Sequence, residues 1–149
     1  MKAIGNVESL LREKRSTVWS IDPDAMVYEA LKLMSHKNVG ALPVIGNDEL
    51  LGLVSERDYT RKVVLKGKSS RDTPIRDIMT STVITVELSN SIEECMQLMT
   101  NNRIRHLPVV VHGKVIGIIS IGDVVHWIIS AQSQALHQME DYIAGKYPG

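Results

Sequence analysis

The chain has 149 residues, which is enough for a compact fold with a buried core, and its apolar content of 44% is ordinary for a globular protein. Lys and Arg together number 17, as do Asp and Glu, so the formal net charge is zero. This balance argues against a general nucleic-acid binder, which needs a basic excess, and against a protein held to a membrane surface by charge.

No apolar run approaches the length of a membrane span, and the N-terminal residues lack the apolar core of a signal peptide. The single cysteine, Cys95, cannot form an internal disulfide or a cysteine-based zinc site. We therefore expect a reducing, cytoplasmic location, with no membrane and no nucleic acid as partner. Net neutrality carries a solubility cost, which self-association would relieve.

The predicted elements begin with a β-prone stretch at 17–21 and an amphipathic helix whose apolar residues Val27, Ala30 and Met34 recur at helical spacing. Met26 is a poor N-cap for this helix, and Asp22-Pro23 offers an alternative start. Two apolar strands at 42–45 and 50–55 follow, joined by a hairpin-like turn, and a second helix is expected near 57–65.

After a polar segment with Gly and Pro at 66–74, the same elements return: a stretch at 83–86, a helix, strands at 107–111 and 114–120, and a helix at 121–130. Ser91 and Glu94 form a capping-box signature at the start of the first of these helices. On its apolar stripe, Cys95 is interpreted as a small buried hydrophobe. A terminal amphipathic helix is predicted from 134 to 147; docking on its own domain is preferred over a dimer contact.

The two halves match without a gap at an offset of 65 residues, as from Val18 to Val83. The same register aligns Leu42-Pro43-Val44 with Leu107-Pro108-Val109, Gly52 with Gly117, Ser55 with Ser120, and Asp58 with Asp123. One register held across the whole unit indicates an internal duplication of a β-α-β-β-α plan. The predicted organisation is a lead-in at 1–16, copy one at 17–66, a linker and lead-in at 67–79, copy two at 80–131 and the terminal helix at 132–149.

Leu-Pro-Val on a strand, followed by Gly-x-x-Ser-x-x-Asp from strand into helix, occurs in both copies. Together with 77–80, 102–109 and 120–125, these motifs closely resemble the tandem cystathionine β-synthase (CBS) domain pair, or Bateman module. Copy one carries the variant Ser55-Glu56-Arg57-Asp58-Tyr59. The resemblance implies an α/β (α+β) fold of two repeats packed by pseudo-twofold symmetry, with no catalytic or transport domain attached. It also implies a homodimer and a regulated partner protein.

The strongest candidate site is Ser120 with Asp123, repeated as Ser55 with Asp58, each at a strand-to-helix junction. A carboxylate there can accept both hydroxyls of a ribose, and the serine hydroxyl can bond a phosphate or ribose oxygen. The alternative is that Ser and Asp only cap their helices. Repetition in matching places favours ligand binding, above all in copy two.

Arg103, Arg105 and His106 provide three potential cations before the second Leu-Pro-Val strand, which suits a phosphate group; the alternative is a solvated charged turn. Copy one has Asn38, Gly40 and Ala41 at these positions, so the two clefts differ chemically. Arg57, Arg61 and Lys62 are candidates to compensate, although a solvated helix face is the preferred interpretation for them.

The resemblance implies an adenosine moiety between the repeats, with its base on aliphatic side chains and near backbone groups of each first strand. The residues that this implies are Thr82, Val83 and Ile84 for one site, Thr17 and Val18 for the other, and Ala41, Pro108 and Gly122 beside the motifs. The expected ligand is an adenine nucleotide (AMP, ADP or ATP, with NAD(H) as a further candidate), without a required metal. For one of the two residues Val83 and Ile84, ordinary core packing is the preferred interpretation.

No catalytic constellation is visible, and the five histidines lack metal-ligand spacing. We therefore expect a regulatory sensor and not an enzyme, acting through a ligand-dependent change in conformation or dimer geometry. The alternatives are an interaction module that binds no ligand and, with less support, an enzyme acting on a nucleotide.

Overall fold

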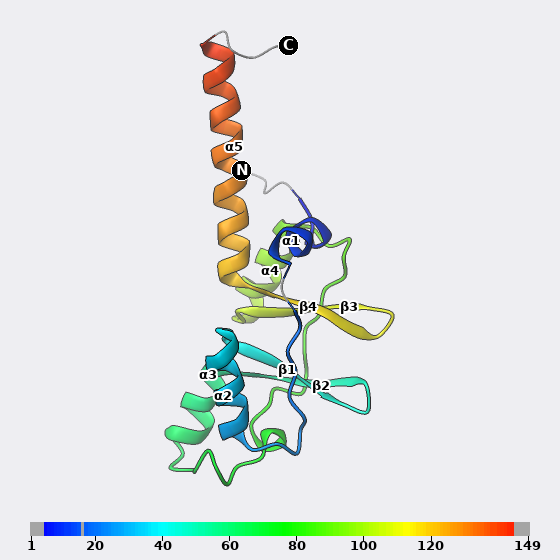
Figure 1. Ribbon diagram of the computed structural model, residues 1–149, viewed down its shortest axis with the longest axis vertical. Coiled ribbons are helices and arrows are strands. Elements are labelled where there is room, and N and C mark those ends of the chain that lie inside the picture. Colours follow the sequence, from blue (N-terminus) through cyan, green and yellow to red (C-terminus); the bar gives the residue numbers. More distant parts are fainter. Residues whose placement is uncertain (1–4, 16, 145–149) are drawn as a thin grey trace. The chain divides into compact units, whose positions relative to one another are not determined.

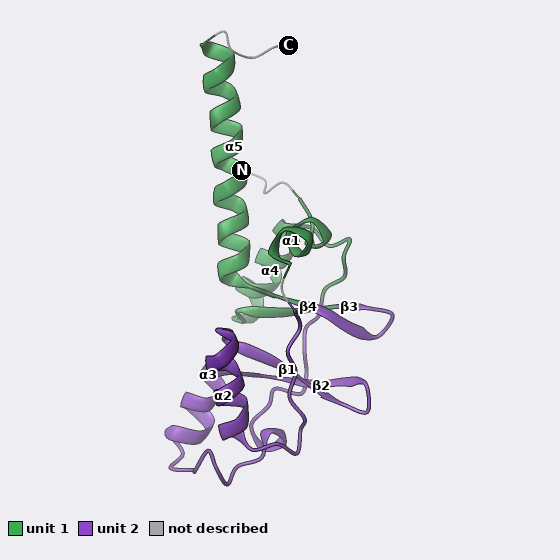
Figure 2. Ribbon diagram, viewed as in Figure 1, with its two compact units in different colours: residues 1–16, 86–109, 118–149 green, residues 17–85, 110–117 purple. Residues whose placement is uncertain are grey.

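The computed structural model describes residues 5–15 and 17–144 (Figure 1). The chain divides into two compact units (Figure 2). Unit 1 combines the N-terminal helix with residues 86–109 and 118–144, and unit 2 combines residues 17–85 with 110–117. Each duplicated copy supplies most of one unit, which confirms the mixed α+β architecture predicted from the repeat.

Copy one folds around the hairpin of β1 (Ala41–Gly46) and β2 (Glu49–Ser55), paired antiparallel with Ala41 opposite Ser55. Asn47 and Asp48 both adopt positive φ, as a tight hairpin turn of matching twist requires. The helix α2 (Val27–Lys37) packs its apolar stripe on this hairpin. The buried core consists of Val27, Ala30, Met34, Leu42, Val44, Val54, Val63, Ile75 and Ile78.

Copy two repeats the plan with α4 (Ile92–Asn102), β3 (His106–Val111) and β4 (Lys114–Ser120), followed by the long helix α5 (Ile121–Ile143). Its buried residues occupy repeat-equivalent places: Ile92, Cys95, Met99, Leu107, Val109 and Ile119. Cys95 is fully buried, and burial raises the pKa of its thiol to about 11. The interpretation of Cys95 as a core residue is therefore confirmed.

The segments that precede the two copies are exchanged between them. The stretch at 73–80 contains the short 3-10 helix Ile75–Asp77 and packs on copy one, where Leu53 and Thr80 exchange backbone hydrogen bonds of 2.9 Å. The helix α1 (Val7–Lys14) instead packs on copy two, where the backbone N–H of Val7 donates to Asn90 at 2.9 Å. Sequence order had associated each lead-in with the copy that follows it, whereas in the structure each joins the other copy.

The predicted first strands at 17–21 and 83–86 are wrong in extent. Each is reduced to one parallel bridge, Ile21 with Val44 and Val86 with Val109. The parallel ladder would next need an N–H from the residue before Val44 or Val109, and that residue is Pro43 or Pro108. Because proline has no N–H, the Leu-Pro-Val motif stops the ladder on the N-terminal side of this pair.

The helix near 57–65 forms as a single turn, α3 (Glu56–Tyr59), that continues into the π-helical segment Thr60–Val64. The helices expected at 121–130 and 134–147 are one continuous helix, α5, because no Gly or Pro interrupts residues 123–143. Residues 145–147 of that prediction lie outside the described part of the chain.

Helix α4 has the predicted capping box of Ser91 and Glu94, and α2 has no side-chain cap at Met26. The alternative start at Asp22-Pro23 is wrong, because the side chain of Asp22 instead accepts from the N–H of Asp24 in a turn.

Candidate functional site

The two Ser-x-x-Asp motifs adopt the same geometry where β2 and β4 run into helices. In copy two the backbone N–H of Ser120 donates to Oδ2 of Asp123 at 2.9 Å, and the N–H of Asp123 donates to Ser120 Oγ at 3.1 Å. In copy one the corresponding distances for Ser55 and Asp58 are 2.9 and 3.2 Å. Both motifs are therefore capping boxes, and the carboxylate of each is held at the junction in a defined orientation.

Asp123 is also joined to a residue from the far end of the sequence. Lys14, in the last turn of α1, donates from Nζ to Asp123 Oδ2 at 2.7 Å and to the carbonyl of Ile118 at 2.8 Å. Burial alone would raise the pKa of Asp123, but the hydrogen bonds from Lys14 and Ser120 lower it below its usual value. The carboxylate is thus ionised and paired, and the described hydrogen bonds to it all end on Oδ2.

Asp58 is paired differently. Its cation is Lys62, one turn along the same helical segment, with Nζ 3.0 Å from Asp58 Oδ1. Lys62 also donates to the carbonyl of Ile78 at 2.8 Å. Lys62 therefore plays at Asp58 the part that Lys14 plays at Asp123. The two sites differ because the lysine of copy one is close to its aspartate in sequence, whereas Lys14 comes from a distant segment.

The start of β3 lies beside Asp123, because the N–H of Ile121 donates to the carbonyl of Arg105 at 2.8 Å. His106 follows and is half-buried. Burial lowers the pKa of His106 below 6.5, and the positive charge of Lys14 lowers it further, more than the opposing effect of Asp123 raises it. His106 is consequently neutral at neutral pH, and the cationic groups of this region are Lys14, Arg103 and Arg105.

Sequence reasoning identified Arg103 and Arg105 but missed Lys14. Arg103 ends α4 in a left-handed backbone conformation, with φ 53°, so the chain turns sharply before Arg105. Lys14 lies 109 residues from Asp123 and belongs to no repeated motif. The only available signal was the position of Lys14 in the last turn of an amphipathic segment, and this position does not indicate with which residue Lys14 forms an ion pair.

The remaining predicted residues lie as follows. Ala41 is buried opposite Ser55, whereas Arg57 and Arg61 are exposed on α3 and the π-helical segment. Thr17 and Thr82 are exposed, while Val18, Val83 and Ile84 are half-buried, and all five belong to unit 2. Ser120 and Asp123 belong to unit 1. Pro108 is buried in β3, and Gly122 is exposed in the first turn of α5.

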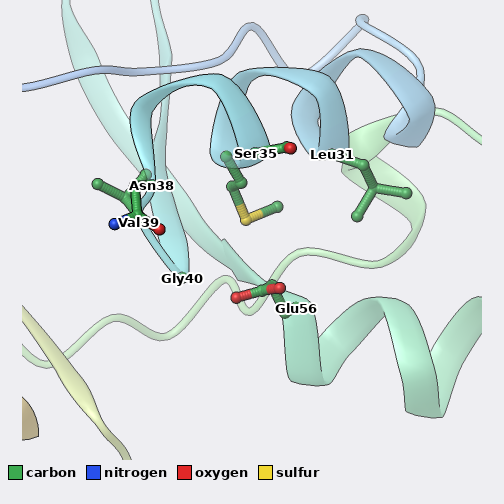
Figure 3. Close-up of a pocket in the computed structure, with 7 residues that line it drawn as sticks. Leu31, Ser35, Asn38, Val39, Gly40 and Glu56 are labelled. Carbon is green, nitrogen blue, oxygen red and sulfur yellow. The ribbon is translucent and has the colours of Figure 1, made fainter.

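A pocket of about 350 Å³ lies between the end of α2 and the start of α3 (Figure 3). Its lining consists of Leu31, Met34, Ser35, Asn38, Val39, Gly40 and Glu56. Asn38 and Gly40 are the copy-one equivalents of Arg103 and Arg105, so this pocket lacks the guanidinium groups of copy two and carries the carboxylate of Glu56 instead. Sequence reasoning did not single out Glu56, whose counterpart in copy two is Ile121.

A smaller hollow of about 190 Å³ adjoins Asp123 in unit 1 and is lined by Leu10, Glu13, Lys14, Asp123, His126 and Trp127. Within residues 5–15 and 17–144 no group of three or more His, Cys, Asp or Glu side chains could hold a metal ion. Nor does this part of the chain include a helix both long and apolar enough to cross a bilayer.

Two segments of the chain, residues 8–65 and 75–130, match the family model of the CBS domain. The chain belongs to the CBS domain family. Each matched segment contains most of one of the two copies, and the family consists of regulatory modules.

The mitochondrial CBS domain-containing protein CBSX3 of Arabidopsis thaliana is 43% identical over 137 residues, which cover 89% of this chain and 66% of that protein. A solved structure of a protein assigned to signal transduction, with CBS domains, from Burkholderia ambifaria MC40-6 has a TM-score of 0.82 at 46% identity, covering 86% of this chain and 96% of the other. The hexameric CBS-CP12 protein from bloom-forming cyanobacteria has a TM-score of 0.73 at 28% identity, covering 82% of this chain and 70% of the other.

Proposed function

We propose that this protein is a regulatory module that binds an adenosine nucleotide at its strand-to-helix junctions and reports binding through a change in conformation or self-association. The observation that carries the proposal is the duplicated Ser-x-x-Asp capping box, which holds a carboxyl group at the same place in both copies. A ribose has two adjacent hydroxyl donors, and a carboxylate held in this way can accept both.

In copy two the proposed ligand uses the chemistry around Asp123. One ribose hydroxyl donates to Oδ1, and the other competes with Lys14 for Oδ2, which Lys14 occupies at 2.7 Å. Arg103 and Arg105 supply positive charge for the phosphates, since guanidinium groups bind phosphate oxygens in bidentate fashion. Neutral His106 can accept or donate one hydrogen bond without adding charge.

In copy one the proposed binding is weaker. Glu56 lines the pocket between α2 and α3, and Asn38 and Gly40 stand where copy two has arginines. A carboxylate beside a nucleotide phosphate repels it. We therefore infer that copy two is the principal nucleotide site.

Self-association and a regulated partner protein complete the proposal. The hexameric CBS-CP12 neighbour supports self-association of this architecture, because the two chains share the fold over most of their length. A ligand that binds one conformation or assembly more tightly than another shifts the population toward it, and a partner can read that shift.

Calorimetric titration with AMP, ADP, ATP, NAD(H) and S-adenosylmethionine tests the proposal. Asp123→Asn is expected to weaken binding more than Asp58→Asn. The matched control is Glu94→Gln, which makes the same carboxylate-to-amide change in a third capping box away from both junctions. If no nucleotide binds or raises the melting temperature at millimolar concentration, an interaction module without a ligand is the better description. Turnover of ATP or NAD that Asp123→Asn abolishes would instead support an enzyme.

A further inference from the structure

The C-terminal helix α5 carries an apolar stripe that extends along most of its length. The exposed large hydrophobic residues of this helix are Ile121, Val125, Ile129, Leu136, Met139, Tyr142 and Ile143, with exposed fractions from 47% to 78%. Most exposed apolar residues of soluble proteins occur singly, so a row of this length marks an interaction surface.

The spacing of the stripe is that of a coiled-coil seam. Val125, Ile129, Gln132, Leu136, Met139 and Ile143 follow one another at alternating steps of four and three residues. This alternation is the heptad pattern, in which a and d side chains of one helix fit between those of a partner helix. Gln132 forms one polar layer in the middle of the seam, a feature that sets register in coiled coils at some cost in stability.

The second half of α5 receives little support from its own unit. Every residue from 132 to 140 is exposed, and the helix extends away from the rest of unit 1 (Figure 1). A helical segment of about 12 residues is marginal in water without tertiary contacts. This part also lies beyond the second CBS domain, whose match ends at residue 130, so it is a feature of the chain outside the domain itself.

We propose that the seam on α5, from Val125 to Ile143, pairs with the same seam of a second copy of this chain. This pairing rests on the self-association in the proposed function, for which it identifies the surface. It does not depend on nucleotide binding. The exposed side chains offer on the order of 600 Å² per chain, close to the roughly 800 Å² that each partner buries in a standard interface. A heptad seam packs against an identical seam, which gives a closed twofold pair.

The charges on α5 agree with a second copy as the occupant. The helix contains no Lys or Arg and three acidic residues, Asp123, Glu140 and Asp141, none of which is on the seam. Asp141 lies 3.8 Å from His137 on the same helix, away from the stripe. Two identical seams therefore meet without like charges facing one another, whereas a strongly basic or acidic partner would find no complementary charge along the stripe.

Sedimentation equilibrium of the full chain tests this pairing with two double variants of equal charge. Leu136→Lys/Met139→Lys places two cations in the seam, and Gln134→Lys/Gln138→Lys places two cations on the opposite face of the same turns. We expect the wild type and the second variant to dimerise alike, and the first variant to raise the dissociation constant at least about 100-fold, since a buried charge opposes pairing. Circular dichroism on both variants checks that the two units remain folded.

Each outcome distinguishes this inference from the wider proposal. A seam variant that associates as tightly as the wild type would overturn the pairing through α5 while leaving self-association through another face. A wild type that stays monomeric at every concentration would overturn both. Nucleotide titration of the seam variant reports separately on Asp123, which is not part of the seam.

Discussion

Replacing Lys14 by Met removes a partly buried ion pair that joins the two ends of unit 1. Lys14 donates to Asp123 at 2.7 Å and to the carbonyl of Ile118 at 2.8 Å, and the side chains of Lys14 and Asp123 are only 27% and 24% exposed. Hydrogen bonds to charged groups contribute about 1.5–3 kcal/mol, and partial exposure reduces this through solvent screening. We expect Lys14→Met to lower the free energy of unfolding of unit 1 by about 1–2 kcal/mol at pH 7.

The pH dependence of that loss has a definite sign. The pKa of Asp123 is lower in the folded state than its usual value, so the pairing stabilises the fold above that usual value, about 3.9. The stabilisation is lost as the pH falls through the folded pKa and Asp123 takes up a proton. The difference between wild type and Lys14→Met is therefore expected to shrink as the pH is lowered below about 4.

Urea unfolding followed by tryptophan fluorescence measures this difference in unit 1 alone. The chain has two tryptophans, and in a Trp19→Phe background the remaining Trp127 lies in the same unit as Lys14. Arg12→Met is the matched control, because Arg12 also forms an ion pair from α1, with Glu8, but one that is 75% and 52% exposed. The reasoning is refuted if both variants lose the same stability, or if the effect of Lys14→Met is unchanged between pH 7 and pH 3.

Further predictions concern core packing, a titration and a thiol. Leu42→Ala and Leu107→Ala truncate two fully buried, repeat-equivalent side chains, and each should destabilise its own unit by about 2–5 kcal/mol. Denaturant unfolding curves that show, for either variant, only the small loss of stability typical of an exposed position would contradict this equivalence. In NMR titrations, Lys14→Met should raise the pKa of His106, since the nearby positive charge lowers it; an unchanged or lower value would be inconsistent with the geometry. A thiol reagent should leave Cys95 unmodified in the folded protein and label it only on unfolding, and rapid labelling at pH 8 would show that it is not buried.

Much of this fold was predictable from local sequence because the signals that set it are local. Helical spacing marked α2 and α4, continuous apolar runs separated by short turns marked both hairpins, and Ser91 with Glu94 marked a helix start. The offset of 65 residues also placed Asp58 and Asp123 at equivalent junctions. The shortening of the first strands on their N-terminal side was predictable in principle from Pro43 and Pro108, whose missing N–H stops the ladder there.

The site itself required the tertiary structure. Which lead-in packs on which copy depends on contacts between segments far apart in the chain, and sequence order suggested the opposite assignment. That exchange is what brings Lys14 to Asp123, lowers the pKa of both Asp123 and His106, and makes the two junctions unequal. The sequence by itself determined that two equivalent carboxylates exist; only folding decided which cation each one meets, because ion pairing depends on distance in space and not along the chain.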